Sequence, residues 1–240
     1  MQKPVVYLVP SLLDENAIHT IPAYLTGSIK KCHVFFVENE RSARRFLKQL
    51  WKACLPNEEL IIDHYEWFTI HKTEEEAVNV FRQKLVEGKN IGIISEAGCP
   101  GVADPGQLLV AAAQEMNIDI KPLTGPNAIL LALMASGMNG QQFQFVGYLP
   151  IDIQQRLQSL KELEAESKRK NCTQIFIETP YRNNQLIEVL VKTCKPSTRL
   201  CIGVDITGED EWIKTKSIGE WKKEKVDIHK RPAIFLLLAP

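Results

Sequence analysis

The sequence predicts an α/β fold made of two α/β domains, and three features of the chain support it. Apolar and β-branched runs such as residues 5–9 and 91–95 have the character of strands that are covered on both faces. Amphipathic helical patterns alternate with these runs, as crossover connections require. In the second half the last strands follow one another without helices. We therefore expect an N-terminal domain at 1–124 and a C-terminal domain with a mixed sheet at 125–240, a boundary near 147–150 being the alternative.

The expected helices and strands are located by local sequence patterns. The helix expected at 74–87 is followed by Gly88, which suits a helix C-cap. The segments 212–218 and 233–238 are expected to be neighbouring antiparallel strands. Strands are also expected at 5–9, 33–37, 91–95, 119–123, 143–147, 173–177 and 199–205, and helices at 41–53, 107–116, 127–136, 154–170 and 184–192.

The composition of the chain argues against several classes of protein. Lys+Arg and Asp+Glu both number 29, which argues against a strongly basic nucleic-acid binder but leaves room for a local basic patch. The N-terminus has no signal-peptide pattern and no apolar run approaches the roughly 20 residues of a membrane span, so we expect a cytoplasmic protein. The six cysteines form no C-x-x-C pair and the five histidines are scattered, so we expect free thiols and no metal site.

The loop at 95–106, SEAGCPGVADPG, is the segment most typical of a ligand site. It holds three glycines, two prolines and two carboxylates between the apolar run 91–94 and a helical pattern. Ligands of open α/β sheets bind at this place, the carboxyl end of a strand. Glycine lets a ligand approach the backbone, so we favour a ligand loop over a simple turn. No histidine is near Cys99 in sequence, and we interpret it as a small pocket-lining residue.

Three other strand-end motifs leave two interpretations open. The segment 124–128, TGPNA, is either a plain helix N-cap or a second wall of the same pocket. Glu38 and Arg41 either begin a helix or lie at the mouth of the cleft. Glu178 and Arg182 either form a structural ion pair or act in the site.

On these motifs the chain resembles the class III, or tetrapyrrole-methylase-like, S-adenosylmethionine (SAM) methyltransferases, and within them the 16S rRNA 2′-O-ribose methyltransferases. That group shows S-D-A-G-T-P-G-I-S-D-P-G after a strand, and residues 95–106 agree at most positions. It shows P-G-P-S-A where 124–128 reads T-G-P-N-A. It shows A-E-D-T-R-T-S-R and Y-E-S-P-H-R where 37–44 reads V-E-N-E-R-S-A-R and 177–182 reads I-E-T-P-Y-R.

The resemblance implies a tetrapyrrole methylase fold, two α/β domains with SAM in a cleft between them, and a homodimer acting on rRNA or the ribosomal subunit. Arg41 and Arg182 would bind the substrate. A ribose hydroxyl acceptor favours a general base, for which Glu38, Asp104 and Glu178 stay open as candidates. The cofactor contacts carried over from the family are Pro10, Glu96, Gly98, Cys99, Asn127, Ala128, Ile177, Pro232 and Ala233.

Two segments depart from the family pattern. The first loop, 9–15, reads VPSLLDE and lacks the glycine and asparagine of A-T-P-I-G-N-L. The stretch after 147–150 lacks the lysines of the rRNA enzymes, although Lys161, Lys168, Arg169 and Lys170 partly restore the charge. Because phosphate contacts dominate nucleic-acid affinity, the missing lysines leave methylation of a small molecule such as a tetrapyrrole open as an alternative. The altered first loop leaves open a SAM-binding paralogue or interaction module without catalysis.

Overall fold

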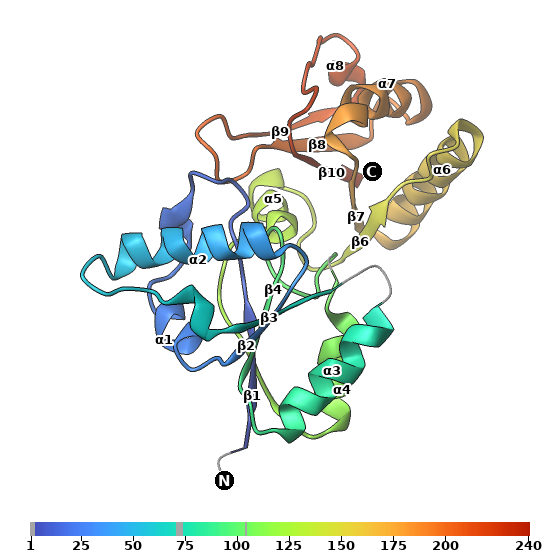
Figure 1. Cartoon of the computed structure of the whole chain (residues 1–240). Helices are drawn as coiled ribbons and strands as arrows, with labels where there is room; N and C mark the ends of the chain where they lie inside the picture. Colours follow the sequence, from blue (N-terminus) through green and yellow to red (C-terminus); the bar gives the residue numbers. More distant parts are fainter. Residues whose placement is uncertain (1–2, 71–73, 104) are drawn as a thin grey trace. The chain divides into compact units, whose positions relative to one another are not determined.

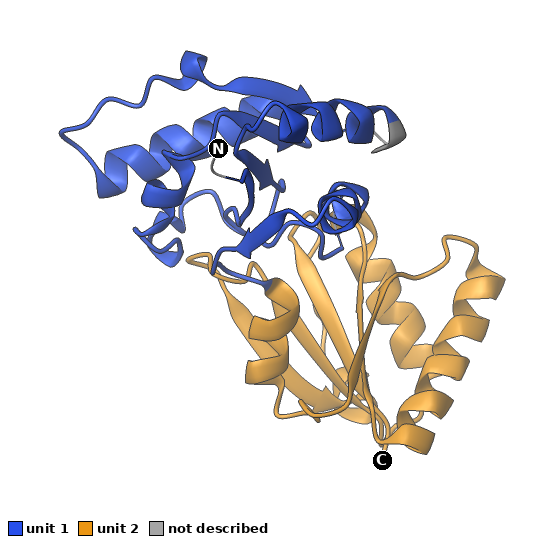
Figure 2. Ribbon diagram, turned by 90° about the horizontal axis from the view of Figure 1, so that it is seen from below, with its two compact units in different colours: residues 1–127 blue, residues 128–240 orange. Residues whose placement is uncertain are grey.

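The computed structural model describes residues 3–70, 74–103 and 105–240. The chain divides into two compact units, Met1–Asn127 and Ala128–Pro240, which Figure 2 colours separately. The sequence-based division lay between residues 124 and 125. Within the described ranges, no helix combines the length and the apolar character that crossing a membrane requires.

Unit 1 is built on a five-stranded sheet whose strands are all parallel, in the order β3-β2-β4-β1-β5 (Figure 1). Every residue of the inner strands β2 and β4 is buried, which explains their unbroken apolar sequences. The strands are β1 (Val5–Val9), β2 (Val34–Val37), β3 (Glu66–Thr69), β4 (Ile91–Ile94) and β5 (Asp119–Pro122).

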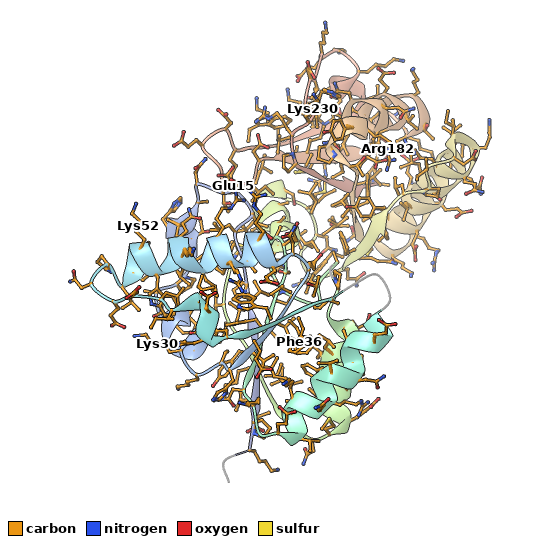
Figure 3. The ribbon with its side chains drawn as sticks, in the orientation of Figure 1. Glu15, Lys30, Phe36, Lys52, Arg182 and Lys230 are labelled. Atoms are coloured by element: carbon orange, nitrogen blue, oxygen red, sulfur yellow. The ribbon has the colours of Figure 1, made fainter. Side chains whose placement is uncertain are left out.

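Helices cover both faces of this sheet because successive strand residues point to opposite sides. Phe35 and Val37 pack with the residues of α1 (Leu25–Ile29) and α2 (Glu40–Cys54). Phe36 packs on the other side, against Phe68 and against Phe81 of α3 (Figure 3). The helices on that second face are α3 (Glu74–Val86) and α4 (Gln107–Glu115).

The strand order creates a topological switch point at the middle of the sheet. β1 and β4 are hydrogen-bonded neighbours, yet the chain leaves β1 toward α1 on one face and leaves β4 toward α4 on the other. Loops that diverge in this way leave a crevice outside the carboxyl ends of the two strands, where open α/β sheets bind ligands.

Unit 2 has a mixed sheet in the order β6-β7-β10-β8-β9, with β6 and β7 parallel and the other pairs antiparallel. Figure 2 shows α5 on one side of this sheet and α6 with α7 on the other. The strands are β6 (Phe143–Tyr148), β7 (Thr173–Ile177), β8 (Arg199–Val204), β9 (Trp212–Ser217) and β10 (Ala233–Leu238). The helices are α5 (Ala128–Ser136), α6 (Ile153–Lys170), α7 (Asn183–Thr193) and α8 (Ile218–Trp221), and short 3-10 turns occur at Ile18–Thr20, Ile62–His64 and Pro180–Arg182.

The expected pairing of segments 212–218 and 233–238 is wrong. β9 pairs with β8, and β10 lies between β7 and β8. The sequences explain this outcome. β10 reads AIFLLL and is buried from its second residue onward, so it takes a position with neighbours on both sides. β9 reads WIKTKS, and its lysines suit the exposed edge of a sheet.

The short edge strand β3 and the helices α1 and α8 have no counterpart among the predicted elements. β3 reads EWFT and all four of its residues are only partly buried, so its pattern carries neither the apolar run nor the alternation that marks a strand. α1 and α8 have five and four residues, too few to show helical periodicity.

Substituting Gly92 tests the packing between β4 and its neighbour β2. A Cβ at this position would lie 2.3 Å from Cε1 of Phe35 and 3.3 Å from Sγ of Cys32, so Gly92→Ala overpacks a closed core. We expect the free energy of unfolding, measured by urea denaturation, to fall by about 1–3 kcal/mol.

Gly27 in α1 is the matched control, since a Cβ there meets nothing within 4 Å. Gly27→Ala removes a glycine from a helix, and we expect it to leave stability unchanged or to raise it by up to about 1 kcal/mol. Equal destabilisation by both substitutions would contradict the packing argument.

Candidate functional site

The loops that follow β1 and β4 are joined by a backbone bridge at the switch point. The Ser11 amide donates to the carbonyl oxygen of Gly98 at 2.8 Å, and the Ser95 hydroxyl donates to the same oxygen at 3.1 Å. Both serines are buried. These hydrogen bonds therefore hold the two loops together at the place where the topology predicts the crevice.

Gly98 is required at this bridge for two reasons. Its φ of +75° lies in the left-handed region that side chains disfavour. A Cβ would also approach Cδ2 of Leu13 at 3.3 Å and the carbonyl oxygen of Pro126 at 3.4 Å. The glycine thus lets the loops after β1, β4 and β5 come together.

The loop after β5 closes onto the same place. A Cβ on Gly125 would lie 2.3 Å from Cβ of Pro10, so the Pro10 ring packs directly against the Gly125 backbone and leaves no space for a side chain there. The Cys99 thiol donates to the carbonyl oxygen of Pro126 at 3.6 Å, and the Thr124 amide donates to the Tyr24 hydroxyl at 2.7 Å. Three strand-end loops predicted separately from sequence thus contact one another in unit 1.

The end of β2 attaches to the glycine loop through carboxylates. Glu38 accepts a hydrogen bond from the Glu96 amide at 3.0 Å, and the Ser42 hydroxyl donates to the Glu96 carboxylate. Asn39 caps α2 by accepting from the amides of Arg41 and Ser42 at 3.0 and 3.3 Å. The V-E-N-E-R-S sequence therefore starts a helix and also fixes Glu96 in position.

A hollow of about 250 Å³ opens beside these contacts, lined by the loop after β1, the first half of α2 and the end of β4. Apolar surface comes from residues such as Phe46 and Ile94, and the polar lining residues are Ser11, Glu15, Ser42, Arg45, Gln49, Ser95 and Glu96. Pockets for small molecules typically have about 300–1,000 Å³, so this hollow alone suits one part of a nucleoside-sized ligand.

The predicted site residues fall into two groups. Unit 1 holds Pro10, Glu38, Glu96, Gly98 and Cys99 at the joined loops, Arg41 in the first turn of α2, and Asn127 directly after Pro126. Unit 2 holds Ala128, Ile177, Glu178, Arg182, Pro232 and Ala233. Asp104 lies outside the described residues.

Within unit 2, three of the predicted residues lie at one end of its sheet. Ile177 of β7 pairs with Ile234 of β10, and Ala233 pairs with Val204. The Pro232 carbonyl oxygen accepts from the Asp205 amide at 3.0 Å. The carboxyl end of β7 thus lies beside the start of β10, and Ala128 begins α5.

Glu178 and Arg182 form an ion pair that continues into the core of unit 2. The Glu178 carboxylate lies 2.6 Å from Nη2 of Arg182 and 3.3 Å from Nη2 of Arg156, and it accepts from the Thr179 amide at 2.7 Å. The Glu178 and Arg156 side chains are 1% and 2% exposed. Arg156 also donates through Nε to the carbonyl oxygen of Pro150 at 2.8 Å.

The surroundings of Glu178 decide which charge state it prefers. Burial raises the pKa of its carboxyl, but hydrogen bonds from Arg182 and from the Thr179 amide and the charges of both arginines outweigh burial and hold that pKa below its ordinary value. The hydrogen bond to Glu178 raises the pKa of Arg182. A carboxylate stabilised in this way is a weak proton acceptor, which favours the structural interpretation of the pair.

Arg156, Ser11 and Ser42 were not among the site residues predicted from sequence. A signal for Arg156 existed: it shares a helix face with Leu160, four positions on, and a cation on an apolar face needs a buried partner. Ser11 and Ser42 carry no such signal, because small hydroxyl residues beside strand ends are common in turns.

All six cysteines are free, and burial raises the pKa of the Cys32 thiol to about 12. The described residues contain no group of three or more His, Cys, Asp or Glu side chains that could hold a metal ion.

The chain is similar to a family of methylases and to several curated proteins. A family model described as tetrapyrrole (corrin/porphyrin) methylases matches residues 27–222. Ribosomal RNA small subunit methyltransferase I of Escherichia coli O157:H7 is 31% identical over 186 residues, which are 74% of this chain and 64% of that relative. The protein of the same name from Halalkalibacterium halodurans is 43% identical over 98 residues, 41% of this chain and 32% of the relative. The matched part of the chain thus spans less than two thirds of either relative.

A solved structure described as the methyltransferase CobJ has a TM-score of 0.63 with this chain, covers all of both chains and is 14% identical. At that identity the likeness shows the fold alone.

Replacing Glu178 tests the buried ion pair. Glu178→Gln keeps the side-chain volume but leaves the buried Arg156 cation without its counter-charge. We expect the free energy of unfolding at neutral pH to fall by about 3 kcal/mol, as when one partner of a buried pair is removed.

The exposed pair of Glu188 and Lys192, with side chains 69% and 75% exposed, supplies the control. We expect Glu188→Gln to change stability by less than about 0.5 kcal/mol. Because the folded pKa of Glu178 lies below its unfolded value of about 4.3, its contribution is complete above that pH and is lost as the pH falls through the folded value. A gap between wild type and Glu178→Gln that stays constant from pH 7 to pH 3 would contradict this account.

Proposed function

The chain belongs to the tetrapyrrole (corrin/porphyrin) methylase family, and we propose that it is a SAM-dependent methyltransferase that methylates a ribose 2′-hydroxyl of small-subunit rRNA. The observation that carries the proposal is the glycine loop 95–106, joined at the switch point to the loops after β1 and β5. The names of the relatives support rRNA as the substrate, and action on rRNA makes this a step of rRNA processing.

The residues at the switch point fit SAM in two respects. Gly98 and Gly125 let the loops after β1, β4 and β5 approach closely, with Leu13 against Gly98 and the Pro10 ring against Gly125, and glycine-rich loops of this kind let a ligand approach the backbone. Glu96 is exposed beside the hollow of about 250 Å³, and its carboxylate can accept hydrogen bonds from ligand hydroxyl or ammonium groups. The hollow suits part of the cofactor, and we propose that the family-derived residues of unit 2, Ala128, Ile177, Pro232 and Ala233, bind the rest.

Bound SAM supplies a methyl group on a sulfonium, ready for direct displacement by an acceptor oxygen. The contribution of the chain to such a reaction is alignment of the reacting atoms. The bridge between Ser11 and Gly98 keeps the loops at a fixed separation, and the hydrogen bonds of Glu38 and Ser42 orient Glu96. The positions of the site residues are therefore fixed by hydrogen bonds within the chain itself.

For the general base we keep three candidates, and their surroundings make them unequally suited to accept a proton. Glu178 is held by two arginines and its pKa is lowered, so it suits the role least. Glu38 is engaged with the Glu96 amide but lies next to the hollow-lining residues. Asp104, in the glycine loop, completes the set. We propose Arg41, in the first turn of α2, and Arg182, in the 3-10 turn after β7, as substrate contacts, since each cation follows the carboxyl end of a strand and Arg182 stays partly exposed in its pair with Glu178.

We further propose that the protein is a cytoplasmic homodimer. The relatives act on ribosomal RNA by name, and ribosomal subunits reside in the cytoplasm. Sedimentation equilibrium of the purified protein decides between monomer and dimer.

A transfer experiment tests the proposed function. The full chain is incubated with methyl-labelled SAM and small ribosomal subunits that carry no methyl group at the acceptor. We expect label in 16S rRNA, in a dinucleotide that resists alkaline hydrolysis, because methylation of the 2′-oxygen blocks cleavage of the adjacent phosphodiester.

The alternatives give other results in the same experiment. Label in an added tetrapyrrole but not in RNA indicates a small-molecule methylase, and absence of label from both with SAM still bound indicates a paralogue without catalysis. Either result overturns the proposed rRNA substrate.

Gly98→Val tests the cofactor site. A branched side chain at φ +75° would fill the space between Leu13 and Pro126, so we expect titration calorimetry to show SAM binding weakened at least a hundredfold or lost.

Gly101 provides a matched control. It has the same φ of +75°, but a Cβ there meets nothing within 4 Å. Gly101→Val therefore adds the same backbone strain without filling the junction. Circular dichroism establishes that both variants fold. SAM affinity that falls equally in both variants would assign the effect to strain and contradict the proposed junction.

A further inference from the structure

Helix α2 carries its positive charge in one stripe, which we call the α2 cation stripe: Arg41, Arg44, Arg45, Lys48 and Lys52. From Arg41 through Arg45 and Lys48 to Lys52 the steps are four, three and four positions, which is the spacing of one helix face. The helix contains one acidic residue, Glu40, in a chain with equal numbers of acidic and basic residues. The charge is therefore concentrated on this face.

The orientation of α2 is fixed by its buried face. Phe46, Leu47, Leu50 and Trp51 pack on the sheet of unit 1, so the stripe faces away from it. Figure 3 shows Lys52 projecting from the outer side of α2. A solvated helix surface usually mixes both signs of charge, whereas this one is almost wholly positive.

The three cations at positions 41, 48 and 52 are available to a partner. Within the described part of the chain, no carboxylate forms an ion pair with any of them, and all three are exposed. Arg44 lies 2.9 Å from Glu40 and 3.0 Å from Asp63, and Arg45 lies 2.8 Å from Glu15. Arg45 and Glu15 are exposed, whereas Arg44 is half-buried over the Trp67 ring. Ion pairs at a protein surface contribute little stability, so a phosphate can replace the carboxylates.

The α2 cation stripe lies beside the candidate site. It begins beside Ser42, whose hydroxyl contacts Glu96, and Arg45 lines the hollow of the candidate site. A second, more open depression of about 630 Å³ is lined by Glu40 and by Arg41, Arg44, Arg45 and Lys48. The twelve residues from Arg41 to Lys52 extend about 16 Å along the helix axis, enough for several successive phosphates of a nucleic-acid strand.

We propose that the α2 cation stripe is an RNA-docking surface that binds the phosphate backbone of the rRNA next to the acceptor nucleotide. The choice of RNA as the partner rests on the proposed function. Phosphate contacts fix the register of a nucleic acid without reading its sequence. The stripe thus supplies, from unit 1, cations of the kind missing from the stretch after 147–150.

The test compares double charge reversals in the full chain, with protein-free 16S rRNA transcript as the probe in filter-binding titrations at several salt concentrations. For Lys48→Glu with Lys52→Glu we expect at least tenfold weaker binding at low salt. We also expect the slope of log affinity against log salt to become shallower by about 1.5–2, as two lost phosphate contacts require. SAM affinity is the readout of intact folding.

Lys31→Glu with Lys89→Glu is the matched control, because it changes the same charge in the same unit. These lysines lie just before β2 and β4, at the amino ends of the strands, and the joined loops are at the carboxyl ends. Equal losses in both double variants, or an unchanged salt slope in the stripe variant, would overturn the proposal. Loss of binding to intact subunits with undiminished binding to the transcript would assign the stripe to a ribosomal protein and would also overturn it.

The outcome separates this inference from the proposed function. A wild-type protein that methylates rRNA while the stripe variant binds RNA normally refutes the stripe alone. A stripe variant that loses RNA binding, in a protein that transfers no methyl group to RNA, supports the stripe and refutes the proposed function.

Discussion

The carbonyl oxygen of Gly98 is the point on which the candidate site depends. It accepts hydrogen bonds from the amide of Ser11 and the hydroxyl of Ser95, and so ties together loops that leave two neighbouring strands toward opposite faces of the sheet. That arrangement is possible only at a residue that adopts positive φ and has no side chain to intrude between Leu13 and Pro126. The departures of the first loop from its family pattern leave this contact intact, because it uses a backbone amide.

Carboxylates in the two units serve different physical purposes. Glu96 is exposed and its carboxylate accepts from a neutral donor, the Ser42 hydroxyl, so it keeps the capacity to accept from a ligand. Glu178 is buried and committed to two arginines, and it joins the segment after β6 to the segment after β7. Their sequence contexts look alike, a strand followed by an acid. The difference arises from Arg156 and Arg182, which reach only one of the two.

Sequence patterns predicted the positions of strands well where apolar residues were continuous, as in β2 and β10. They also singled out the glycine loop as a candidate ligand site. They could not predict the place of β10 between β7 and β8, because hydrophobic pattern reports burial but not which neighbour supplies it. β3 escaped prediction because partly buried edge strands carry little pattern. In the candidate site, the pattern at strand ends led to Glu38, Glu96 and Gly98, whose loops the structure joins, whereas the contacts of Ser11, Ser42 and Arg156 depend on distant segments that sequence spacing does not reveal.

The central position of β10 has a consequence for synthesis of the protein. The strand contributes hydrogen bonds to both β7 and β8, yet it spans residues 233–238 and is therefore translated after every other strand. Until it emerges from the ribosome, β7 and β8 each present an unsatisfied edge, and the apolar surface beneath them stays open to water. The N-terminal unit has all five of its strands by residue 122 and can fold while translation continues, whereas the second unit must complete its sheet in one late, long-range event.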